Sequence, residues 1–421
     1  MKKIMQLLGS NQKISGWKIN ADSKESYELF FVKGKLETVR CTDTCDKLVT
    51  VYVDHGDCKG DAQFVVYPST TEAQLEKHLQ EAVEKALLIG NPGYDLPGKE
   101  TGSYTVESNF TQFAPGELAE KIAMCVFAAN TVERASLNSV EVFVNKRTER
   151  VVNSRGLDKT QVRYDAMVEA IPTYNGETQS VELYEQYNFS SLDTDALTRE
   201  IAEKMAEVKA RYEALVPTEE IRCPVVLNPL ELEQLFYNIA GDLHYASVYS
   251  HSNLWSKGDA IQKEPTGDPI TVTMCGQISG SIRSRSFDSD GLALGNVCLV
   301  DHGKAVNYYG SNRYGQYLGE KPTGDLGCVC VAPGTAVMPQ GEYLEVVSMS
   351  GLQVDFFNDY IGGEIRLAYW CRNGKMVPVT GISVSGSASE VLSSIGLTEK
   401  TTVHGSYFGP EKAILQGMKV F

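Results

Sequence analysis

Residues 228–236, NPLELEQLF, contain a glutamate that could either take part in chemistry or cap a helix. Such a carboxylate can act as a catalytic base, or it can accept a free backbone N–H at the start of a helix. Asn228 is a favourable N-cap residue, Pro229 suits the first helical position, and Glu231 then falls at the third. We therefore interpret Glu231 as half of a capping box, in which it accepts the Asn228 backbone N–H.

The helix that begins after Asn228 is explained by packing. Its apolar residues recur with helical spacing and predict one buried face on a helix of about twenty residues. These residues are Leu232, Leu235, Phe236, Ile239, Ala240 and Leu243.

The histidines do not form a metal-binding pattern on this helix. A catalytic zinc site built on a helix needs imidazoles on one face of that helix, an open coordination position for water and a carboxylate that acts as the base. No histidine occurs between His78 and His244. His244 and His251 are seven residues apart and lie beyond the apolar stripe, which favours helix-end or loop packing. We expect no metal ligands and no catalytic residues in the chain.

The ten cysteines have no spacing typical of a disulfide framework, which favours a reducing cytoplasm. Cys41/Cys45 and Cys328/Cys330 are the only close pairs, and neither has the spacing of a structural zinc site. Cys328 and Cys330 alternate with Val329 in GCVCVAP, which predicts one face of a buried strand.

Two further segments carry reactive or charged groups. Cys371 precedes an Asn-Gly turn, so we expect it to be half-buried and inert. FDSDG (287–291) could bind a hard cation by its composition, but a calcium loop needs a longer carboxylate series, and a turn is expected instead.

Charge and hydropathy exclude two classes of partner. A net charge of −15 disfavours direct binding of nucleic acid, which needs a basic surface. No apolar run is long enough to cross a bilayer, and the start, MKKIMQLLGSNQ, has too short an apolar core for a signal peptide. We expect a cytoplasmic protein that contacts neither nucleic acid nor membrane.

Patterning predicts an α+β fold with two domains, residues 1–216 and 217–421. In the first domain, ELFFVKGKLETV from Glu28 resembles EVFVNKRTERVV from Glu141, at an offset of 141 − 28 = 113 residues. Each stretch opens a set of alternating strands that ends in an amphipathic helix, so we predict two duplicated units of antiparallel strands and a helix. A capping box at Thr71 and Gln74 starts the first of these helices, and a third helix is expected over about 116–132.

The second domain is predicted to be mainly antiparallel β structure opened by the helix from Asn228. Short apolar runs, such as CVCVAP, YLEVVSM and EIRLAYW, are separated by turn signals such as RNG.

Three stretches resemble the TldD/PmbA family, historically called modulators of DNA gyrase, and the likeness covers nearly the whole chain. They are NKRTERVVNSRG (145–156), residues 285–319, which begin RSFDSDGLALGNV, and residues 351–386, which begin GLQVDFFNDYIGG. In that family the TldD kind carries HExxxH on the helix that opens its C-terminal domain. There two histidines and a cysteine near the C-terminus hold a metal, and the glutamate serves as base.

The PmbA kind, also called TldE, lacks the motif and pairs with TldD in a cytoplasmic peptide-degrading complex. The resemblance implies that this chain is such a non-catalytic subunit with a vestigial metallopeptidase-type C-terminal domain. It implies a TldD-type paralogue as partner, unstructured peptides as substrate, a homodimer when the chain is alone, and zinc only on the partner, hence no cofactor here. His404, at the place of the family's Cys-Gly, and Arg285 and Asp288, in the segment resembling its FDxEG stretch, are candidates for the site region.

Two other functions stay open. The chain could be a stand-alone peptidase that acts through an unrecognised metal site or through Cys371. It could also be an interaction protein that acts on gyrase.

Overall fold

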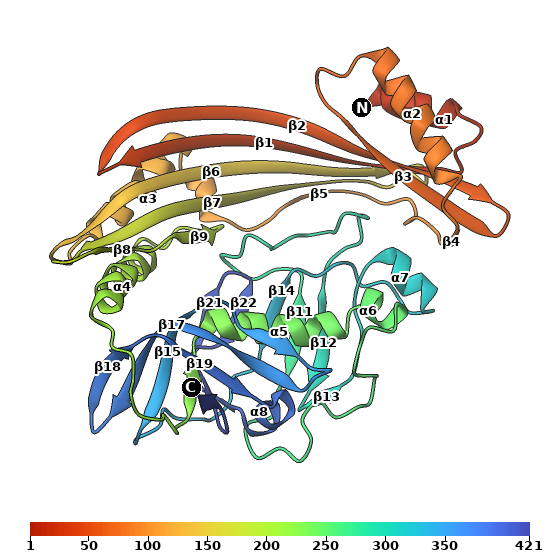
Figure 1. Ribbon diagram of the computed structural model, residues 1–421. Coiled ribbons are helices and arrows are strands. Elements are labelled where there is room, and N and C mark those ends of the chain that lie inside the picture. The colour runs from red at the N-terminus through yellow and green to blue at the C-terminus, as the bar shows by residue number, and fades with distance from the viewer.

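A computed structural model describes residues 1–421 of the chain. The predicted α+β fold is confirmed, with three sheets of mostly antiparallel strands. Figure 1 shows one long, curved sheet arching over a second body that contains the other two sheets. We call the long sheet with its helices the arch, residues 1–213, and the part below it the C-terminal body, residues 225–421. The domain boundary at 216/217 stays a prediction.

The arch is built on a nine-stranded sheet. Its strands are β1 (Gly16–Val32), β2 (Lys35–His55), β3 (Cys58–Val66), β4 (Asn91–Pro92), β5 (Thr101–Thr105), β6 (Ala135–Asn153), β7 (Asp158–Asn175), β8 (Ser180–Glu182) and β9 (Glu185–Phe189). The order is β4-β3-β2-β1-β6-β7-β5, and β8 and β9 also pair with β7. The four central strands have 17 to 21 residues each, so they run the length of the arch.

The pairing of β1 with β6 agrees with the predicted duplication. Glu28 pairs with Phe143, and Phe30 pairs with Glu141. The offset of 141 − 28 = 113 residues converts one pair into the other, as a two-fold axis between β1 and β6 requires. Outward from this axis, β1, β2 and β3 on one side match β6, β7 and β9 on the other.

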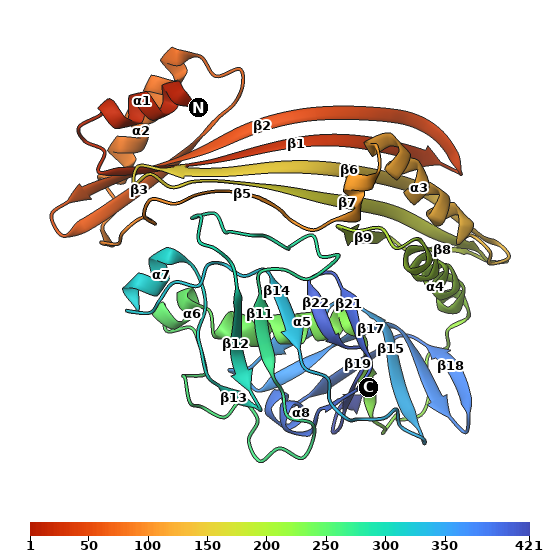
Figure 2. The same ribbon diagram turned by 180° about the vertical axis from the view of Figure 1, so that it is seen from behind.

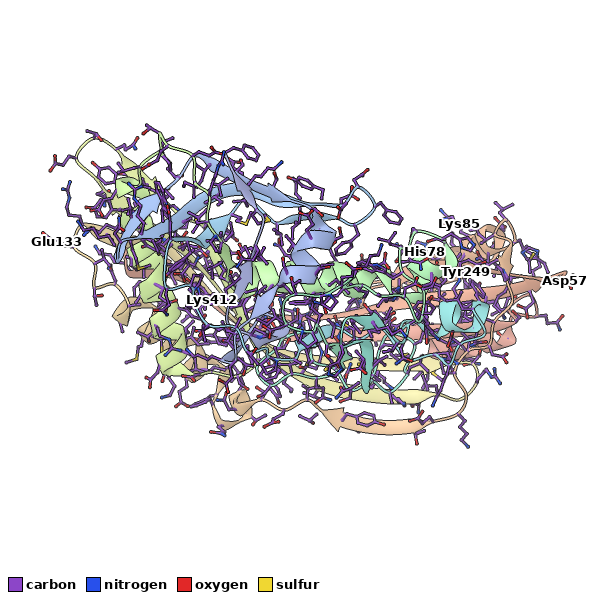
Figure 3. All side chains as sticks on the ribbon, turned by 90° about the horizontal axis from the view of Figure 1, so that it is seen from below. Asp57, His78, Lys85, Glu133, Tyr249 and Lys412 are labelled. Carbon is purple, nitrogen blue, oxygen red and sulfur yellow. The ribbon has the colours of Figure 1, made fainter.

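Helices gather at the two ends of the arch, with α1 and α2 at one end and α3 and α4 at the other (Figures 1 and 2). Their bounds are α1 (Lys2–Ser10), α2 (Glu72–Ala86), α3 (Pro115–Ala128) and α4 (Thr194–Glu213). The capping box predicted at Thr71 and Gln74 is confirmed. The α1 helix was not predicted from the sequence. Figure 3 places His78 and Lys85 of α2 at one end of the elongated molecule and Glu133 at the other.

The C-terminal body contains two sheets and four helices. One sheet consists of β10 (Val225–Leu227), β15 (Tyr343–Met349), β16 (Gln353–Asp355), β17 (Tyr360–Arg372), β18 (Lys375–Val379), β19 (Ile382–Gly386), β20 (Gly396–Leu397), β23 (Ala413–Leu415) and β24 (Lys419–Val420). The six-stranded sheet consists of β11 (Val272–Cys275), β12 (Asn296–Asp301), β13 (Lys304–Ala305), β14 (Cys328–Val331), β21 (Thr401–His404) and β22 (Tyr407–Pro410). The helices are α5 (Pro229–Asp242), α6 (Tyr245–Tyr249), α7 (Asn312–Tyr317) and α8 (Ala388–Ser394).

The strand orders are β20-β23-β10-β15-β17-β19-β24, with β16 and β18 on β17, and β13-β12-β11-β14-β22-β21. Two pairs, β10 with β15 and β14 with β22, are parallel. The α5 helix packs on the six-stranded sheet, and its predicted apolar face joins a core of 42 buried residues from both sheets. No helix of the chain combines the length and the apolar character needed to cross a membrane.

The α5 helix is shorter than the predicted twenty residues, because tertiary contacts end it at Asp242. The Tyr245 backbone N–H donates to the Tyr309 carbonyl at 2.7 Å, which turns the chain away from the helix axis. His244 Nδ1 then caps α6 by accepting the Ala246 backbone N–H at 3.2 Å. His244 therefore has the helix-end role that the sequence predicts.

Candidate functional site between the arch and the C-terminal body

A cavity of about 940 Å³ separates the α4 end of the arch from the C-terminal body. Its upper wall comes from β9 and the first turns of α4. Its lower wall comes from the start of α5, from residues 279–280 and from the turn at 403–405. Figure 2 shows β9 directly above β21 and β22. Of the three candidate residues, His404 lines this cavity, whereas Arg285 and Asp288 do not.

Glu233 fixes the shape of the lower wall. It projects from the second turn of α5, and its Oε1 accepts the Ser406 backbone N–H at 3.1 Å and the Ser406 hydroxyl. The Tyr237 hydroxyl, one turn further along α5, lies 2.9 Å from Ser406 Oγ. Gly405 has a φ of +56°, and a Cβ there would lie 2.8 Å from Glu233 Oε2. A larger residue at Gly405 would therefore displace Glu233.

His404 faces the cavity from the same turn, and its side chain is open to the solvent within it. Protein groups nevertheless surround the imidazole, and this desolvation lowers the pKa of His404, while the Glu233 carboxylate acts in the opposite direction. The imidazole is therefore neutral at pH 7 and offers one hydrogen-bond donor and one acceptor.

The cavity wall contains carboxylates and no lysine or arginine. The acidic residues are Asp193, Glu200 and Glu233. Asp193 Oδ1 accepts two backbone N–H groups in the first turn of α4, at 2.9 and 3.1 Å, so that carboxylate caps the helix. Burial, followed by the nearby Glu203 carboxylate, raises the pKa of Glu200. Because the wall has carboxylates and no cationic side chain, the cavity has a negative potential. This potential favours a ligand with an ammonium or guanidinium group.

Tyr187 lines the wall, but its polar group is buried inside the protein. Its hydroxyl oxygen is buried and has no hydrogen-bond partner. Burial raises the pKa of Tyr187, so the hydroxyl keeps its proton. Because the oxygen has no accessible surface, Tyr187 contributes other atoms to the wall, and its hydroxyl is not in contact with the cavity. Neither Tyr187 nor Glu233 was identified from the sequence, although Glu233 stands out as a polar residue beside the apolar stripe of α5.

Glu231 is only partly the capping residue that the sequence predicts. Asn228 Oδ1 accepts the backbone N–H of Leu230, the second helical residue, at 2.9 Å, so Asn228 is the predicted N-cap, but a capping box would use the N–H of the third residue, Glu231. The reciprocal hydrogen bond from the Asn228 backbone N–H to the Glu231 carboxyl is not well formed, and Glu231 Oε2 is buried without a partner. Burial raises the pKa of Glu231 to about 7, against the opposing effect of its own backbone N–H and that of Asn228. Glu231 is 2% exposed and does not line the cavity.

Asp288 organises a turn, as predicted for FDSDG. Its side chain is 2% exposed, and burial raises the pKa of Asp288 to about 6. Oδ1 accepts the backbone N–H groups of Asp290 and Leu292, each at 2.9 Å, and Oδ2 accepts that of Asp325 at 3.1 Å. The carboxylate is therefore fully used inside the protein.

The loop that Asp288 shapes, residues 286–291, binds the underside of the arch. Lys159 Nζ donates to the Gly291 carbonyl at 2.9 Å. Gln161 accepts the Ser286 backbone N–H at 2.8 Å and donates to the Phe287 carbonyl at 3.2 Å. This loop is the main polar joint between the two parts of the molecule.

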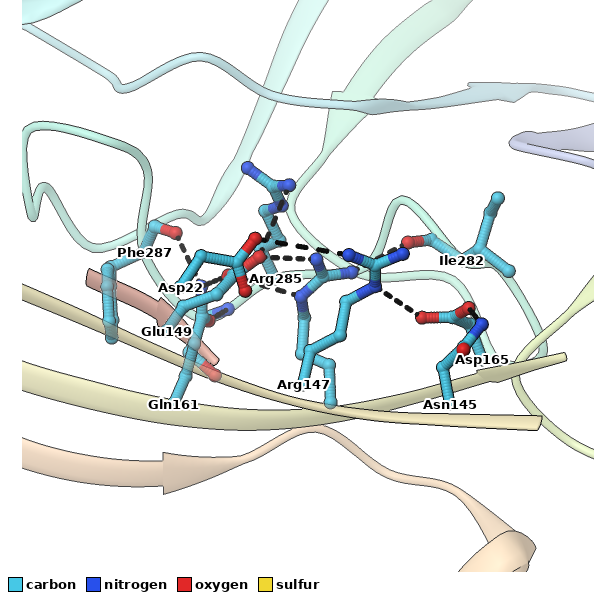
Figure 4. A network of polar contacts seen from close by, with 11 residues as sticks. Asp22, Asn145, Arg147, Glu149, Gln161, Asp165, Ile282, Arg285 and Phe287 are labelled. Carbon is cyan, nitrogen blue, oxygen red and sulfur yellow. Dashed lines mark hydrogen bonds and ion pairs between the residues drawn. The ribbon is translucent and has the colours of Figure 1, made fainter. Parts of the chain in front are cut away.

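Arg285 belongs to a charged network on the same joint, which Figure 4 shows between the arch strands and the loop. Its Nη2 lies 3.5 Å from Glu149 Oε1, and burial lowers the pKa of Arg285. Arg163 binds both oxygens of Glu149, and Arg147 binds Asp165 at 2.7 Å. Because each guanidinium faces a carboxylate, the network joins the two parts of the molecule and offers no free anion site.

The cavity residues do not fit a catalytic metal. The structure contains no group of three or more His, Cys, Asp or Glu side chains placed to hold a metal ion. His404 supplies one nitrogen, and Glu233 supplies a carboxylate that already binds Ser406. A catalytic zinc ion takes three protein ligands, so this donor set is insufficient.

Comparison with known proteins gives one family match and one curated relative. Residues 220–420 match the family described as PmbA/TldA metallopeptidase C-terminal domain. The metalloprotease PmbA homolog of Haemophilus influenzae is 24% identical over 438 residues, which cover 97% of this chain and 90% of the relative.

Two solved structures share the fold over the whole length. TldE from Thermococcus kodakarensis superposes with a TM-score of 0.80 at 15% identity, covering 100% of this chain and 99% of that one. A proposed modulator of a DNA gyrase from Thermotoga maritima superposes with a TM-score of 0.76 at 14% identity, covering 100% and 99%.

Proposed function

We propose that this chain, whose residues 220–420 match the PmbA/TldA metallopeptidase C-terminal domain family, is a TldE-type, non-catalytic subunit of a cytoplasmic metallopeptidase complex. Its partner in this proposal is a TldD-type paralogue, which carries HExxxH and binds the zinc. The substrates are unstructured peptides, and the cavity between the arch and the C-terminal body binds part of them.

The observation that carries the proposal is what α5 presents to the cavity. This helix opens the C-terminal body and has no histidine, so Leu230 and Glu233 line the cavity from it. The cavity nevertheless has a volume of about 940 Å³, near the upper end of the size range of ligand sites. A roomy cavity without a catalytic donor set supports binding of a peptide by this chain and cleavage by its partner.

The groups in the wall indicate which part of a peptide the cavity binds. Glu200 and Glu233 favour a free amino terminus or a basic side chain. The neutral His404 and the amide group of Asn188, both in the lining, can hydrogen-bond to peptide amides and carbonyls. The carboxylate charge therefore supplies the selectivity, and the neutral groups supply contacts common to all peptides.

The test is a peptidase assay with the purified chain, the HExxxH paralogue and their mixture. We expect no cleavage by this chain alone and hydrolysis of an unstructured peptide by the mixture. Glu200→Gln should raise the KM several-fold for a peptide with a free, lysine-containing amino terminus, but not for its acetylated, lysine-free counterpart. Glu213→Gln is the matched control, because Glu213 is an exposed glutamate at the far end of the same helix and does not line the cavity.

The alternative functions predict different results. Stoichiometric zinc in the isolated chain, with cleavage in the absence of the paralogue, would establish a stand-alone peptidase. Co-purification with gyrase and no complex with the paralogue would favour the interaction protein.

A further inference from the structure

Three cysteines of the six-stranded sheet lie on one face of two neighbouring strands. Cys275 of β11 pairs directly with Cys328 of β14, and Thr273 pairs with Cys330. Directly paired residues of antiparallel strands point to the same side of a sheet, and so do residues two positions apart on one strand. Cys275, Cys328 and Cys330 therefore share a face.

Two of these thiols are in direct contact. Cys275 Sγ lies 2.8 Å from Cys330 Sγ, across the diagonal of the β11–β14 pair. Cys328 instead lies 3.7 Å from the Ser281 hydroxyl. Because a disulfide bond is about 2.05 Å long, a short movement of the two side chains brings Cys275 and Cys330 to bonding distance.

Cys330 is the thiol of this pair that solvent and reagents can reach. It is half-buried, whereas Cys275 is 4% exposed. The Cys275 thiol donates its hydrogen bond to the Cys330 sulfur, and this lowers the pKa of Cys330. Burial raises the pKa of Cys328, which is completely buried. Attack therefore begins at Cys330, because the thiolate is the reactive form of cysteine.

We propose that Cys275 and Cys330 form a redox-active dithiol, which a low-molecular-weight disulfide such as oxidised glutathione converts into a disulfide between β11 and β14. The Cys330 thiolate attacks one sulfur of oxidised glutathione, forms a mixed disulfide and releases one glutathione thiolate. The Cys275 thiol then loses its proton to that thiolate and attacks Cys330 Sγ, which expels the second glutathione. The two protein thiols are oxidised by two electrons, and the glutathione disulfide is reduced to two thiols.

The bond would form beside the wall of the cavity. Ser279 and Gly280, which line the cavity, follow Cys275 by only a few residues. On the other strand, Cys330 pairs with Phe408 of β22, and the turn containing His404 joins β22 to β21. Figure 1 shows β11, β14, β22 and β21 side by side in this sheet. Oxidation would therefore tie β11, which leads into Ser279 and Gly280, to β14, whose neighbour β22 is joined to the turn containing His404.

The test uses the unmodified full chain, incubated with either oxidised or reduced glutathione, quenched with an alkylating reagent and mapped by peptide mass spectrometry. We expect a linked pair of peptides containing Cys275 and Cys330 after oxidation only, and its loss on treatment with dithiothreitol. In the reduced chain, Cys330 should be alkylated at least several-fold faster than Cys328. Failure to find this linkage, or a dominant linkage through Cys328, would overturn the proposal.

Variants separate the two steps of the reaction. Cys275→Ser should stop at a glutathione adduct on residue 330, and Cys330→Ser should give neither adduct nor disulfide. Cys298→Ser is the matched control, because Cys298 is a half-buried cysteine of the adjacent strand β12 and should leave the linkage unchanged. Complete oxidation of the Cys275→Ser variant to another internal disulfide would contradict the assignment of Cys275 as the second thiol.

Discussion

Glu231 is a carboxyl group that folding removes from water almost completely. It is 2% exposed, one of its oxygens has no hydrogen-bond partner, and its pKa is about 7 instead of 4.5. The folded chain therefore holds this proton more tightly than the unfolded chain does. The contribution to stability is fully present below about pH 4.5 and is lost as the pH rises through about 7.

Glu231→Gln should remove this pH dependence while keeping the shape of the side chain. We expect the variant to exceed the wild type in free energy of unfolding by roughly 2–3 kcal/mol at pH 8, with the difference shrinking toward pH 5. Urea denaturation of both proteins across this pH range measures it. Glu117→Gln is the control, because Glu117 occupies the equivalent third position of α3, after Pro115, and is exposed. Parallel pH profiles for the wild type and Glu231→Gln would show that the carboxyl group is solvated.

At the scale of elements, the 286–291 loop decides how the C-terminal body meets the arch. Within the loop, the Asp288 carboxylate accepts backbone N–H groups and so stabilises the turn. Side chains of β7 donate hydrogen bonds to the backbone carbonyls of the loop. Lys159 is the most buried of these side chains, at 0% exposure, and it also pairs with Glu100 at 2.6 Å. The loop is therefore held in place by the arch and cannot shift without breaking charged contacts.

Lys159→Met should release this loop, because it leaves the Gly291 carbonyl without a donor and Glu100 without its partner. We expect a loss of roughly 1.5–3 kcal/mol in the free energy of unfolding, the range for a hydrogen bond to a charged group. Amide hydrogen exchange in residues 286–291 should also become faster. Lys146→Met is the control, because the Lys146–Glu25 pair at 3.0 Å is largely exposed and should contribute about 0.5 kcal/mol or less. Equal losses of stability from both substitutions would show that the buried contacts of Lys159 do not hold the 286–291 loop to the arch.

At the scale of the whole molecule, the proposed function concerns assembly. A surface that binds a paralogue of the same fold can also bind a second copy of this chain through a two-fold axis. The purified chain should therefore be a homodimer with an interface above roughly 1,000 Å². Adding the HExxxH paralogue should replace the homodimer with a heteromeric complex in which zinc is bound only to the paralogue.

Size-exclusion chromatography with light scattering, followed by metal analysis of each separated chain, tests this expectation. A monomer that remains a monomer in the presence of the paralogue would remove the basis for a subunit role. A homodimer that does not exchange with the paralogue would leave the fold relationship intact and contradict only the complex.

The sequence by itself determined the features that depend on neighbouring residues. The start of α5 at Asn228, its apolar face, the turn at FDSDG and the repeat relating Glu28 to Glu141 were all read from local spacing. The free backbone N–H groups of a helix are capped by residues a few positions away, and its apolar face is formed by residues at short, regular spacing. Capping residues and periodicity therefore predict both features. The resemblance to the PmbA/TldD family was likewise carried by stretches of consecutive residues.

Only the tertiary structure decided the features that depend on segments far apart in the chain. Glu233 meets Ser406 across 173 positions, Cys275 meets Cys330 across 55, and α5 ends early because Tyr245 binds Tyr309. The raised pKa of Glu231 has the same origin, since the loss of water around a carboxyl group is set by everything packed against it. A spacing rule describes one segment at a time, whereas desolvation and long-range contact are properties of how segments pack.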